Sequence, residues 1–444
     1  MKKLALVLFL AACSNSSSQS HPDGGGGAPD LSTGARDLAV GDLARRVSFP
    51  IEHVIVIVKE NHTFDNYFGS FPGAEGTTTA QTSTGTVQVG EPPLQLTRDL
   101  CHSHECALAD WNGGAMNHWD LGDTQNQSDQ LAFMQYTESD IPNYWQYARH
   151  FTLADHFHAS MLGPSFPGHL FCLAAQTGWA TGNPSQLVPW GCDDGSGTTI
   201  PIEDQKTCTE TTTFPCFKIP TVADLANSAG LTWKFYGSKL PPLVGEIWSM
   251  FDGVDQIRNG PQWSSNVVDE STFDADAAAG TLANIVFLVP QDTNSEHPPF
   301  NICSGENWTV GHINAVMQNA ALWSKTVILF TYDDFGGWYD HVPPPKQYGC
   351  NPAQPYGVGF RLPLVAISPY AKPGYVMHGT KELVQQQASI PKFIESIFAL
   401  PSLASMDPAA QDGPGTDDLM DAFDWSQPPN PPLVLTTRNC LGQR

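Results

Sequence analysis

Three short segments of the chain place carboxylates beside an amide or a histidine. They are Glu60-Asn61-His62, Ser295-Glu296-His297 and Asp333-Asp334, the last followed by Asp340-His341. Oxygen ligands together with imidazole are a set that divalent metal ions bind in proteins. A bound metal would also explain why two adjacent acids, Asp333 and Asp334, stand together, because a cation offsets their repulsion. We therefore expect a divalent metal site built from these segments.

Ser165 is the candidate nucleophile. It stands in Gly163-Pro164-Ser165-Phe166-Pro167-Gly168-His169, ahead of an apolar stretch of helical character. At a helix N-terminus the free N–H groups favour a phosphoryl oxygen, and metal coordination can activate the hydroxyl. The residue types therefore suit attack of a serine on phosphorus.

Each of these segments also has a purely structural interpretation. Glu60-Asn61 could be a solvated loop or a helix cap, and Asp333-Asp334 could open a turn. Ser165 could cap a helix without any role in chemistry. The structural interpretation is weaker for the segments together than for each alone.

Short apolar runs with many β-branched residues indicate the elements that position these side chains. We expect strands, buried on both faces, at Val54–Val58, Leu231–Tyr236, Ile285–Val289, Thr326–Tyr332 and Leu364–Ser368. We expect helices at Val222–Ala229, Trp308–Ser324 and Ile390–Phe398. This succession predicts an α/β fold, with a mostly parallel central sheet flanked by helices. Ligands of such sheets bind at the carboxyl ends of the strands, where three of the polar segments would meet.

Length and charge limit the possible classes of function. With 444 residues, of which 41% are hydrophobic, the chain can bury a large core, so global disorder is excluded. The net charge of −24 argues against nucleic acid as a partner and against a broad basic surface for anionic lipids. We expect one catalytic domain over residues 47–444, with insertion loops near 77–93 and 190–217. The tail after Pro408 should wrap the surface.

The N-terminal residues predict export and attachment to a membrane. Two lysines and a short apolar run read as a signal peptide over residues 1–12, and Leu10-Ala11-Ala12-Cys13 resembles a bacterial lipobox. Cleavage before Cys13 would leave this cysteine to carry a lipid that holds the protein at a membrane. Residues 13–46, rich in Ser and Gly, should form a flexible tether. We expect a protein of the bacterial cell envelope, at the outer membrane or on the periplasmic side, or otherwise a secreted one.

The remaining cysteines predict disulfides of an oxidising compartment. Cys101 and Cys106, and the group Cys192, Cys208 and Cys216, have the spacing of local loop crosslinks. Cys172 lies in an apolar run and is expected to be a buried free thiol. No Cys-x-x-Cys pair occurs, so a thiolate zinc site is not expected.

The segment from Ile51 to Gly69, with its Lys59-Glu60-Asn61-His62-Thr63-Phe64-Asp65 core, resembles the opening block of the bacterial phosphoesterase family. This family contains phospholipases C and a branch of acid phosphatases. Four further blocks agree with the family and follow in its order over residues 50 to 400. They are Asp99–His102 with Trp111–Met116, Gly163–His169, Ser295–Pro299 and Tyr332–Pro345.

The resemblance implies an alkaline-phosphatase-like fold and a phosphoserine intermediate. Carried over residue by residue, it implies that the metal ligands are Glu60, Asn61, Ser165, Asp333 and Asp334. Ser165 would attack phosphorus, while His102 and His297 would hold phosphoryl oxygens or transfer protons to the leaving group. His341, in the same block as Asp340, is a further catalytic candidate. His62, His158 and His169 should pack behind the site.

Two departures from the family pattern bear on the substrate. Ser165 and Asp333-Asp334 resemble the acid phosphatase branch, whereas many phospholipases of the family carry a threonine and an acid–Glu pair, and a longer C-terminal region in the haemolytic ones. We therefore expect hydrolysis of phosphate monoesters. The alternative is a phospholipase C that acts on phosphodiester lipid headgroups such as that of phosphatidylcholine. Such an enzyme could bind choline in an aromatic cage. Candidates for the cage are Trp111, Tyr144-Trp145, Trp233 and Trp338-Tyr339.

Two other classes of protein remain as alternatives. A lipid-anchored binding protein with a degenerate site is disfavoured because all five candidate ligands are present. A sulfatase-like reaction is disfavoured because His169 stands where the modification motif of such enzymes would need an arginine.

Overall fold

The computed structural model describes residues 49–122, 130–186, 190–204, 207, 209–238, 249–345 and 357–440. All of these belong to one compact unit that begins at Ser48. The predicted signal peptide, Cys13, the tether and Cys208 lie outside the described residues. Within the described residues, no helix combines the length and apolarity needed to cross a membrane.

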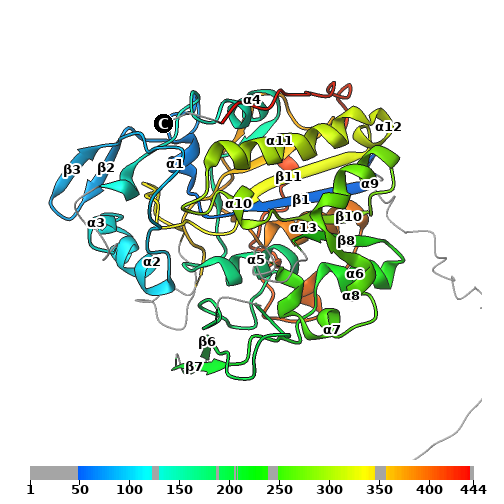
Figure 1. The fold of residues 1–444 in the computed structure, drawn as a ribbon, viewed down its shortest axis with the longest axis horizontal. Coiled ribbons are helices and arrows are strands. Elements are labelled where there is room, and N and C mark those ends of the chain that lie inside the picture. The colour runs from blue at the N-terminus through cyan, green and yellow to red at the C-terminus, as the bar shows by residue number, and fades with distance from the viewer. Residues whose placement is uncertain are drawn as a thin grey trace, which may run out of the picture. The chain divides into compact units, whose positions relative to one another are not determined.

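An eight-stranded sheet forms the centre of this unit (Figure 1). Across the sheet its strands are β13 (Tyr375–Met377), β4 (Thr152–Ala154), β12 (Leu364–Ile367), β11 (Thr326–Tyr332), β1 (His53–Lys59), β10 (Ile285–Leu288), β8 (Trp233–Gly237) and β9 (Val267–Asp269). Only β12 runs against the others, antiparallel to both β11 and β4. The predicted mostly parallel α/β architecture is confirmed, and all five predicted strands are found within two residues of their expected bounds.

Thirteen α-helices lie in the described residues. They are α1 (Phe64–Phe68), α2 (His104–Trp111), α3 (Trp119–Gly122), α4 (Pro142–His150), α5 (Ser165–Ala174), α6 (Val222–Ala229), α7 (Asp255–Arg258), α8 (Trp263–Asn266), α9 (Phe273–Ala279), α10 (Asp292–Ser295), α11 (Ile302–Gln318), α12 (Ala320–Trp323) and α13 (Ser389–Phe398). Helices α4 and α9 contact α11, while α6 and α13 contact α5. Figure 1 shows α11 along β11 and β1 on one side of the sheet, and α5 and α6 on the other.

The predicted helix over Trp308–Ser324 was wrong in its bounds. Helix α11 already begins at Ile302, because the side chain of Asn301 accepts hydrogen bonds from the backbone N–H groups of Cys303 and Ser304. It ends at Gln318, where Asn319 leaves the helical conformation and its side chain caps the separate helix α12. Asparagine favours such caps because its short side chain competes for backbone groups.

Both predicted insertion regions contain a two-stranded hairpin. Strands β2 (Thr79–Thr82) and β3 (Gly85–Gln88) pair in the first, and β6 (Ile200–Asp204) and β7 (Thr209–Thr213) pair in the second. A third small sheet joins β5 (Phe157–His158) to β14 (Gln385–Gln386). These pairs lie outside the central sheet, so they leave the strand order that positions the site undisturbed.

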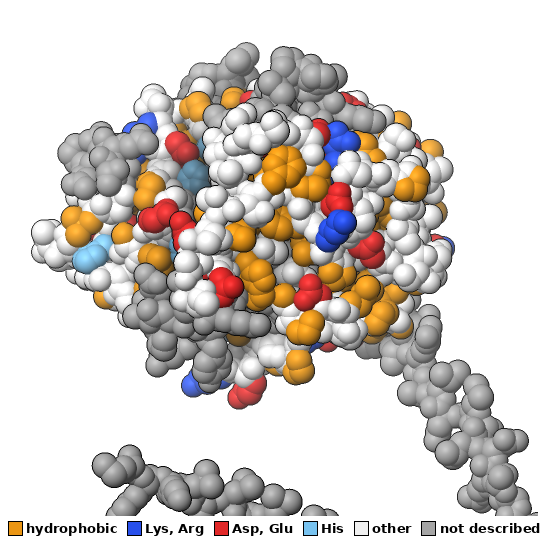
Figure 2. All heavy atoms as spheres, turned by 90° about the horizontal axis from the view of Figure 1, so that it is seen from below, with side chains coloured by type: hydrophobic (Ala, Val, Ile, Leu, Met, Phe, Trp, Pro, Cys, Tyr) orange, Lys and Arg blue, Asp and Glu red, His pale blue; other side chains and the backbone are white. Residues whose placement is uncertain are grey.

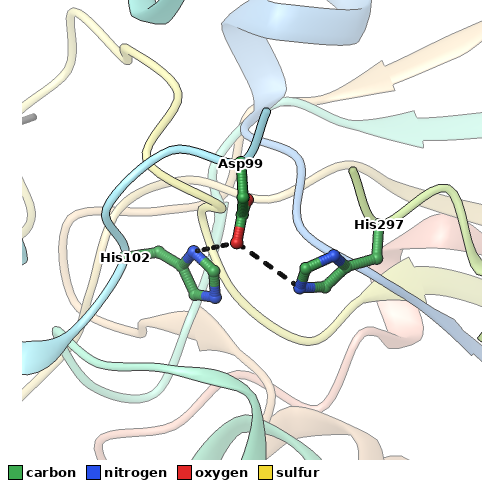
Figure 3. Close-up of side chains that lie close together, drawn as sticks. All are labelled: Asp99, His102 and His297. Carbon is green, nitrogen blue, oxygen red and sulfur yellow. Dashed lines mark ion pairs between the residues drawn. The ribbon is translucent and has the colours of Figure 1, made fainter. Parts of the chain in front are cut away.

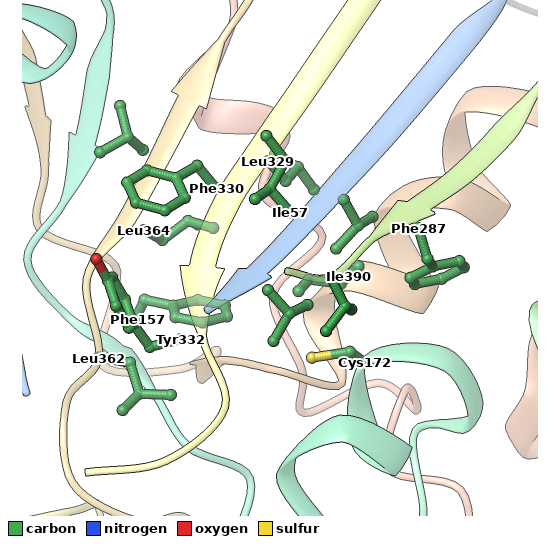
Figure 4. Packing of buried hydrophobic residues seen from close by; sticks show 14 of the residues in the cluster. Ile57, Phe157, Cys172, Phe287, Leu329, Phe330, Tyr332, Leu362, Leu364 and Ile390 are labelled. Atoms are coloured by element: carbon green, nitrogen blue, oxygen red, sulfur yellow. The ribbon is translucent and has the colours of Figure 1, made fainter. Parts of the chain in front are cut away.

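The core is continuous across both faces of the sheet. Every residue of β11 is buried, as are six of the seven in β1. Figure 4 shows the result around the strand ends, where Ile57, Leu329 and Phe330 of the sheet belong to the same buried cluster as Ile390 of α13 and Cys172 of α5. Burial on both faces explains why these strands are continuous apolar runs rather than alternating ones.

Three disulfides crosslink the described residues, and Cys172 is free and buried, as predicted. Cys101 pairs with Cys106, and Cys192 pairs with Cys216. The third disulfide joins Cys303 of α11 to Cys440, across 137 residues of sequence. Near it the side-chain amide of Asn307 donates to the carbonyl oxygen of Arg438 at 2.7 Å, so the end of the described chain lies on α11.

The charge of the protein is visible on its surface. On the face drawn in Figure 2, the basic side chains are few and lie apart from one another, among acidic and apolar ones. This distribution agrees with the excess of 45 acids over 21 bases.

Candidate active site

The pairing of β1 with β11 brings Glu60-Asn61 and Asp333-Asp334 together. The two strands are parallel and in register from His53 opposite Thr326 to Lys59 opposite Tyr332, so the next residues, Glu60 and Asp333, emerge side by side. The backbone N–H of Asn61 donates to Asp333 Oδ1 at 2.9 Å. The same parallel arrangement, through β10, delivers the segment that contains His297 to this edge of the sheet.

Backbone conformation fixes Asn61 in place. Asn61 has a φ of 68°, in the left-handed region that asparagine adopts more readily than most residues. Gly336, with a φ of 60°, approaches so closely that a Cβ atom at this position would overlap Asn61. Its backbone N–H donates to Asp334 Oδ1 at 2.6 Å. The turn with two glycines therefore holds the second carboxylate against the first loop.

Ser165 is the first residue of α5 and is buried. Its hydroxyl donates to Asp334 Oδ2 at 3.0 Å rather than to the backbone of its own helix. The helix starts after Pro164 without a side-chain cap, so the structure gives Ser165 no capping role. Helix α5 reaches the strand ends because Gly168 has no side chain, and a Cβ there would overlap the carbonyl oxygen of Asp333.

His169 also faces the carboxylates, although we expected it only to pack behind the site. Its Nε2 lies 2.7 Å from Glu60 Oε1 and 3.8 Å from Asp333 Oδ2. It follows Ser165 by four residues on α5, and residues at that spacing share one face of a helix. The spacing from the nucleophile candidate was the sequence signal that could have identified it.

The chemistry of these side chains fits a divalent cation. The carboxylates of Glu60, Asp333 and Asp334 offer the oxygen ligands that hard divalent cations prefer, and the hydroxyl of Ser165 lies beside them. The side-chain amide of Asn61 lies among these groups, and its nitrogen donates to Asp333 Oδ1 at 3.1 Å and to both carboxylate oxygens of Asp334 at 3.2 and 3.3 Å.

Burial adds a second argument for a cation. Glu60 Oε2 is buried and has no hydrogen-bond partner among the described residues. Burial, and after it the charge of Asp333, raises the pKa of Glu60 well above its ordinary value. Burial and Asp333 likewise raise the pKa of Asp334. A cation would stabilise the ionised forms of these carboxyls.

Two imidazoles lie on the other side of the Asn61 amide. The other end of the amide, its oxygen, accepts from the Nε2 of His297 at 3.0 Å and lies 3.4 Å from His102 Nε2. The Nδ1 atoms of the two histidines are held by backbone carbonyl oxygens, those of Leu100 at 2.8 Å and Pro298 at 2.6 Å. Both rings therefore present Nε2 to the site.

Asp99 lies between the two imidazoles (Figure 3). Its Oδ2 is 3.7 Å from His102 Nδ1 and 3.8 Å from His297 Nε2. Burial lowers the pKa of His102, but the charges of Asp99 and Asp334 outweigh it and raise this pKa to about 9. We had not selected Asp99 as a site residue, although it stands three residues before His102.

His341 belongs to a different network. Its Nδ1 lies 2.7 Å from Asp65 Oδ2. The buried guanidinium of Arg361 joins Asp65 and Asp340, each at 2.9 Å. The hydrogen bonds of His341 thus connect it to this ion-pair network, whereas Glu60, Asn61, Ser165, Asp333, Asp334, His102 and His297 form one connected group. Arg361 was not selected from the sequence.

Most of the aromatic residues considered for a choline cage are core residues. The buried ones are Tyr144, Trp145, Trp233, Trp338 and Tyr339. Trp111, at the end of α2, is only partly buried. His62 and His158 are buried too, with Nδ1 bonded to Asn66 and to the carbonyl oxygen of Gly359.

At the strand ends of the mostly parallel sheet, α5 places a buried serine beside a cluster of carboxylates and two imidazoles. This arrangement, on a fold of α/β architecture, suits the hydrolysis of esters. Residues 51–401 match the model of the Phosphoesterase family, and the chain belongs to this family. The protein is therefore a hydrolase of phosphoric esters.

Its relatives include bacterial phospholipases C. Phospholipase C A of Mycobacterium tuberculosis is 28% identical over 436 residues, which cover 86% of this chain and 78% of the relative. Non-hemolytic phospholipase C of Pseudomonas aeruginosa is 26% identical over 438 residues, which cover 86% of this chain and 58% of the relative. Among solved structures, the lipoteichoic acid synthase LtaP of Listeria monocytogenes matches with a TM-score of 0.35 and 7% identity, covering 79% of this chain and 72% of that one. A likeness of this size carries no argument about the site.

Proposed function

We propose that the protein hydrolyses phosphate esters through a phosphoserine at Ser165, with the help of a divalent metal ion. The observation that carries this proposal is the hydrogen bond from the Ser165 hydroxyl to Asp334 Oδ2, 3.0 Å long, within the cluster of buried carboxylates. Glu60, Asn61, Ser165, Asp333 and Asp334 would hold the metal. When bound, the metal supplies positive charge that stabilises the transferred phosphoryl group and the serine oxygen.

Each side chain of the site has its own role in the proposed reaction. The Oγ atom of Ser165 forms a bond to phosphorus while the ester oxygen leaves, and the hydroxyl proton moves along the hydrogen bond to Asp334. His102 or His297 gives the leaving oxygen a proton through Nε2. The same imidazole then takes a proton from the water that attacks the phosphoserine. Asp334 returns its proton to Ser165 as phosphate departs, so the enzyme is restored.

The proposal has two candidate substrates, phosphate monoesters and phosphodiester headgroups. Ser165 with Asp333-Asp334 resembles the phosphatase branch of the family and favours monoesters. The second candidate is a phospholipase C that cleaves phosphodiester headgroups, and it is favoured by the names of the relatives. Since most of the predicted aromatic cage is buried, Trp111 is the remaining candidate to contact a choline group.

Purified protein assayed on p-nitrophenyl phosphate and p-nitrophenylphosphorylcholine separates these candidates. We expect turnover that EDTA abolishes and added divalent metal restores. Ser165→Ala should lose at least about a thousandfold in kcat, because the covalent route disappears. Ser228→Ala, on the exposed face of α6, is the matched control and should keep wild-type rates. Acid-quenched protein should carry phosphate on Ser165 by mass spectrometry, and full activity of Ser165→Ala would refute the mechanism.

We also propose that a lipid on Cys13 holds the enzyme at the membrane of the bacterial envelope. The proposal rests on Leu10-Ala11-Ala12-Cys13 in the sequence. Metabolic labelling with a radioactive fatty acid should mark the wild-type protein and fail to mark Cys13→Ala. Equal labelling of both proteins would contradict it.

A further inference from the structure

Beneath the candidate site, the carboxylate of Glu296 is buried among four polar side chains. Its oxygens accept hydrogen bonds from the hydroxyls of Tyr67 at 2.7 Å, Tyr144 at 2.5 Å and Tyr332 at 2.8 Å. The ammonium of Lys59 lies 3.0 Å from Oε1, and both side chains of this ion pair are fully buried. We name these five residues the Glu296 cluster. Charge-assisted bonds of this kind are short and strong, and four of them define one position for the carboxylate.

Three members of the Glu296 cluster directly precede residues of the candidate site in the sequence. They are Lys59 before Glu60, Tyr332 before Asp333 and Glu296 before His297. At the ends of β1 and β11 the chain is extended, so the side chains of Lys59 and Tyr332 point away from those of Glu60 and Asp333. The Glu296 cluster therefore holds together, in the protein interior, the same three segments whose next residues form the candidate site. A fourth segment is attached through Tyr67 of α1.

The backbone at Glu296 shows that this position is constrained. Its φ is 77°, a conformation that is uncommon for a residue with a side chain and that persists only where the surroundings hold it. Gly305 of α11 leaves the space, because a Cβ atom there would overlap the Glu296 side chain. Lys59 Nζ also donates to the carbonyl oxygens of Asn294 at 2.5 Å and Gly305 at 3.0 Å, so both sides of the His297 segment are tied to β1.

We propose that Glu296 is a positioning residue for His297: its buried carboxylate fixes the left-handed turn that aims the imidazole at Asn61. This inference rests on the proposed role of His297 in phosphoester hydrolysis. Lys59 and Tyr332 connect that turn to the ends of β1 and β11, so the histidine keeps its place relative to the carboxylates. Glu296 itself does not touch the substrate.

Glu296→Gln tests the proposal because it keeps the shape of the side chain and replaces one carboxylate oxygen by an NH₂ group. This group is a donor, and it would face the tyrosine hydroxyls or the Lys59 ammonium, which are donors too. We expect kcat for p-nitrophenyl phosphate to fall by on the order of 10- to 100-fold, with KM changed less than threefold, as a slight misplacement of a catalytic group predicts. The control is Glu306→Gln, an equally buried acid of α11 that pairs with Arg438. It should lower Tm and leave kcat within twofold of wild type.

A double-mutant comparison asks whether Glu296 acts through His297. In a His297→Ala background, Glu296→Gln should lower kcat by less than twofold, because the group that it positions is already gone. The same loss in both backgrounds would overturn the proposal, as would wild-type kcat in the single variant. If Glu296→Gln does not fold, Tyr332→Phe and Tyr144→Phe remove one hydroxyl each and should lower kcat several-fold. Unchanged kcat in both would also overturn it.

Hydrogen exchange separates this inference from the proposed function, because it requires no turnover. The amides of residues 294–297 and 300 should exchange at least tenfold faster in Glu296→Gln than in wild type. In Glu306→Gln their exchange should be unchanged. If exchange is faster in Glu296→Gln but the wild-type protein hydrolyses no phosphate ester, the structural role of Glu296 stands and the proposed function is rejected. Unchanged exchange in an active enzyme would reject the role of Glu296 and leave the function standing.

Discussion

His169 and Glu60 form the shortest contact between the nucleophile helix and the strand-end carboxylates, with 2.7 Å between Nε2 and Oε1. Burial lowers the pKa of His169 to about 4, so the ring is neutral at pH 7 and its Nε2–H can donate to the carboxylate. Side chains that orient a ligand in this way contribute to metal affinity. His169 therefore connects Ser165 and the proposed metal through one turn of α5.

We predict that His169→Asn weakens metal binding by on the order of 10- to 100-fold, since Glu60 loses the partner that orients it. Isothermal titration of metal into EDTA-stripped, dialysed protein measures the effect. His150→Asn, at the surface end of α4, is the control and should bind as wild type does. Equal affinities for the two variants would show that His169 only fills space.

The residues that directly follow strands were predictable from the sequence, whereas Asp99 and Arg361 were not. Glu60 and Asp333 could be placed together because parallel register is predictable from two apolar runs. Arg361 could not, since its partners Asp65 and Asp340 are distant in sequence. Asp99 stands close to His102 in the sequence, but its second partner, His297, is distant, and Asp99 follows no predicted strand. The connection of His341 to Asp65 was hidden for the same reason.

At the scale of elements, the approach of α5 to the strand ends depends on Gly168. We predict that Gly168→Ala destabilises the fold by about 1–3 kcal/mol, because the added methyl overlaps the Asp333 carbonyl. The activity of the folded enzyme should also fall, as the helix moves Ser165 away from Asp334. Thermal unfolding and kcat provide the two measurements.

Gly311→Ala is the matched control for this prediction. Gly311 is a glycine of α11, and no atom would lie within 4 Å of an added Cβ atom. Alanine favours helices over glycine by about 1 kcal/mol, so this variant should gain slightly in Tm and keep its activity. A loss of stability in Gly311→Ala equal to that in Gly168→Ala would contradict the packing argument.

Helix α13 carries a carboxyl whose ionisation should make stability depend on pH. Burial, and then the neighbouring Asp412, raises the pKa of Glu395 to about 9, while its ordinary value is 4.5. Between these values the native state keeps a proton that the unfolded state releases, so this residue lowers stability as pH rises from 4.5 towards 9. Glu395→Gln removes the titrating group and keeps an oxygen for the backbone N–H of Leu403.

We predict that the Tm of Glu395→Gln exceeds that of wild type by more at pH 8 than at pH 5. Calorimetry at both pH values measures the difference. Glu138→Gln, on a side chain at the surface that is 45% exposed, is the control for the substitution itself. A Tm difference for Glu395→Gln that does not grow with pH would refute the assignment.

At the scale of the whole molecule, the disulfide between Cys303 and Cys440 closes 137 residues and fastens the end of the described chain to α11. Spacing could not predict this pair, because nothing local links its two halves. We predict that Cys303→Ser with Cys440→Ser lowers the free energy of unfolding by about 2–5 kcal/mol, as loss of a native crosslink does. Denaturant unfolding measures it, and kcat at 25 °C should stay within twofold of wild type, since neither cysteine contacts the site. An unchanged unfolding midpoint would show that the tail is held by its other contacts alone.

The position of β1 in the sheet has a consequence for biosynthesis. Its two partners, β10 and β11, begin at Ile285 and Thr326, so a nascent chain holds His53–Lys59 with both edges unpaired until most of the protein has been made. An apolar seven-residue strand with both edges unpaired is prone to aggregation until its partner strands are made. Chains interrupted before Tyr332 should therefore precipitate rather than fold, and production of the enzyme should depend on factors that keep unfinished chains apart.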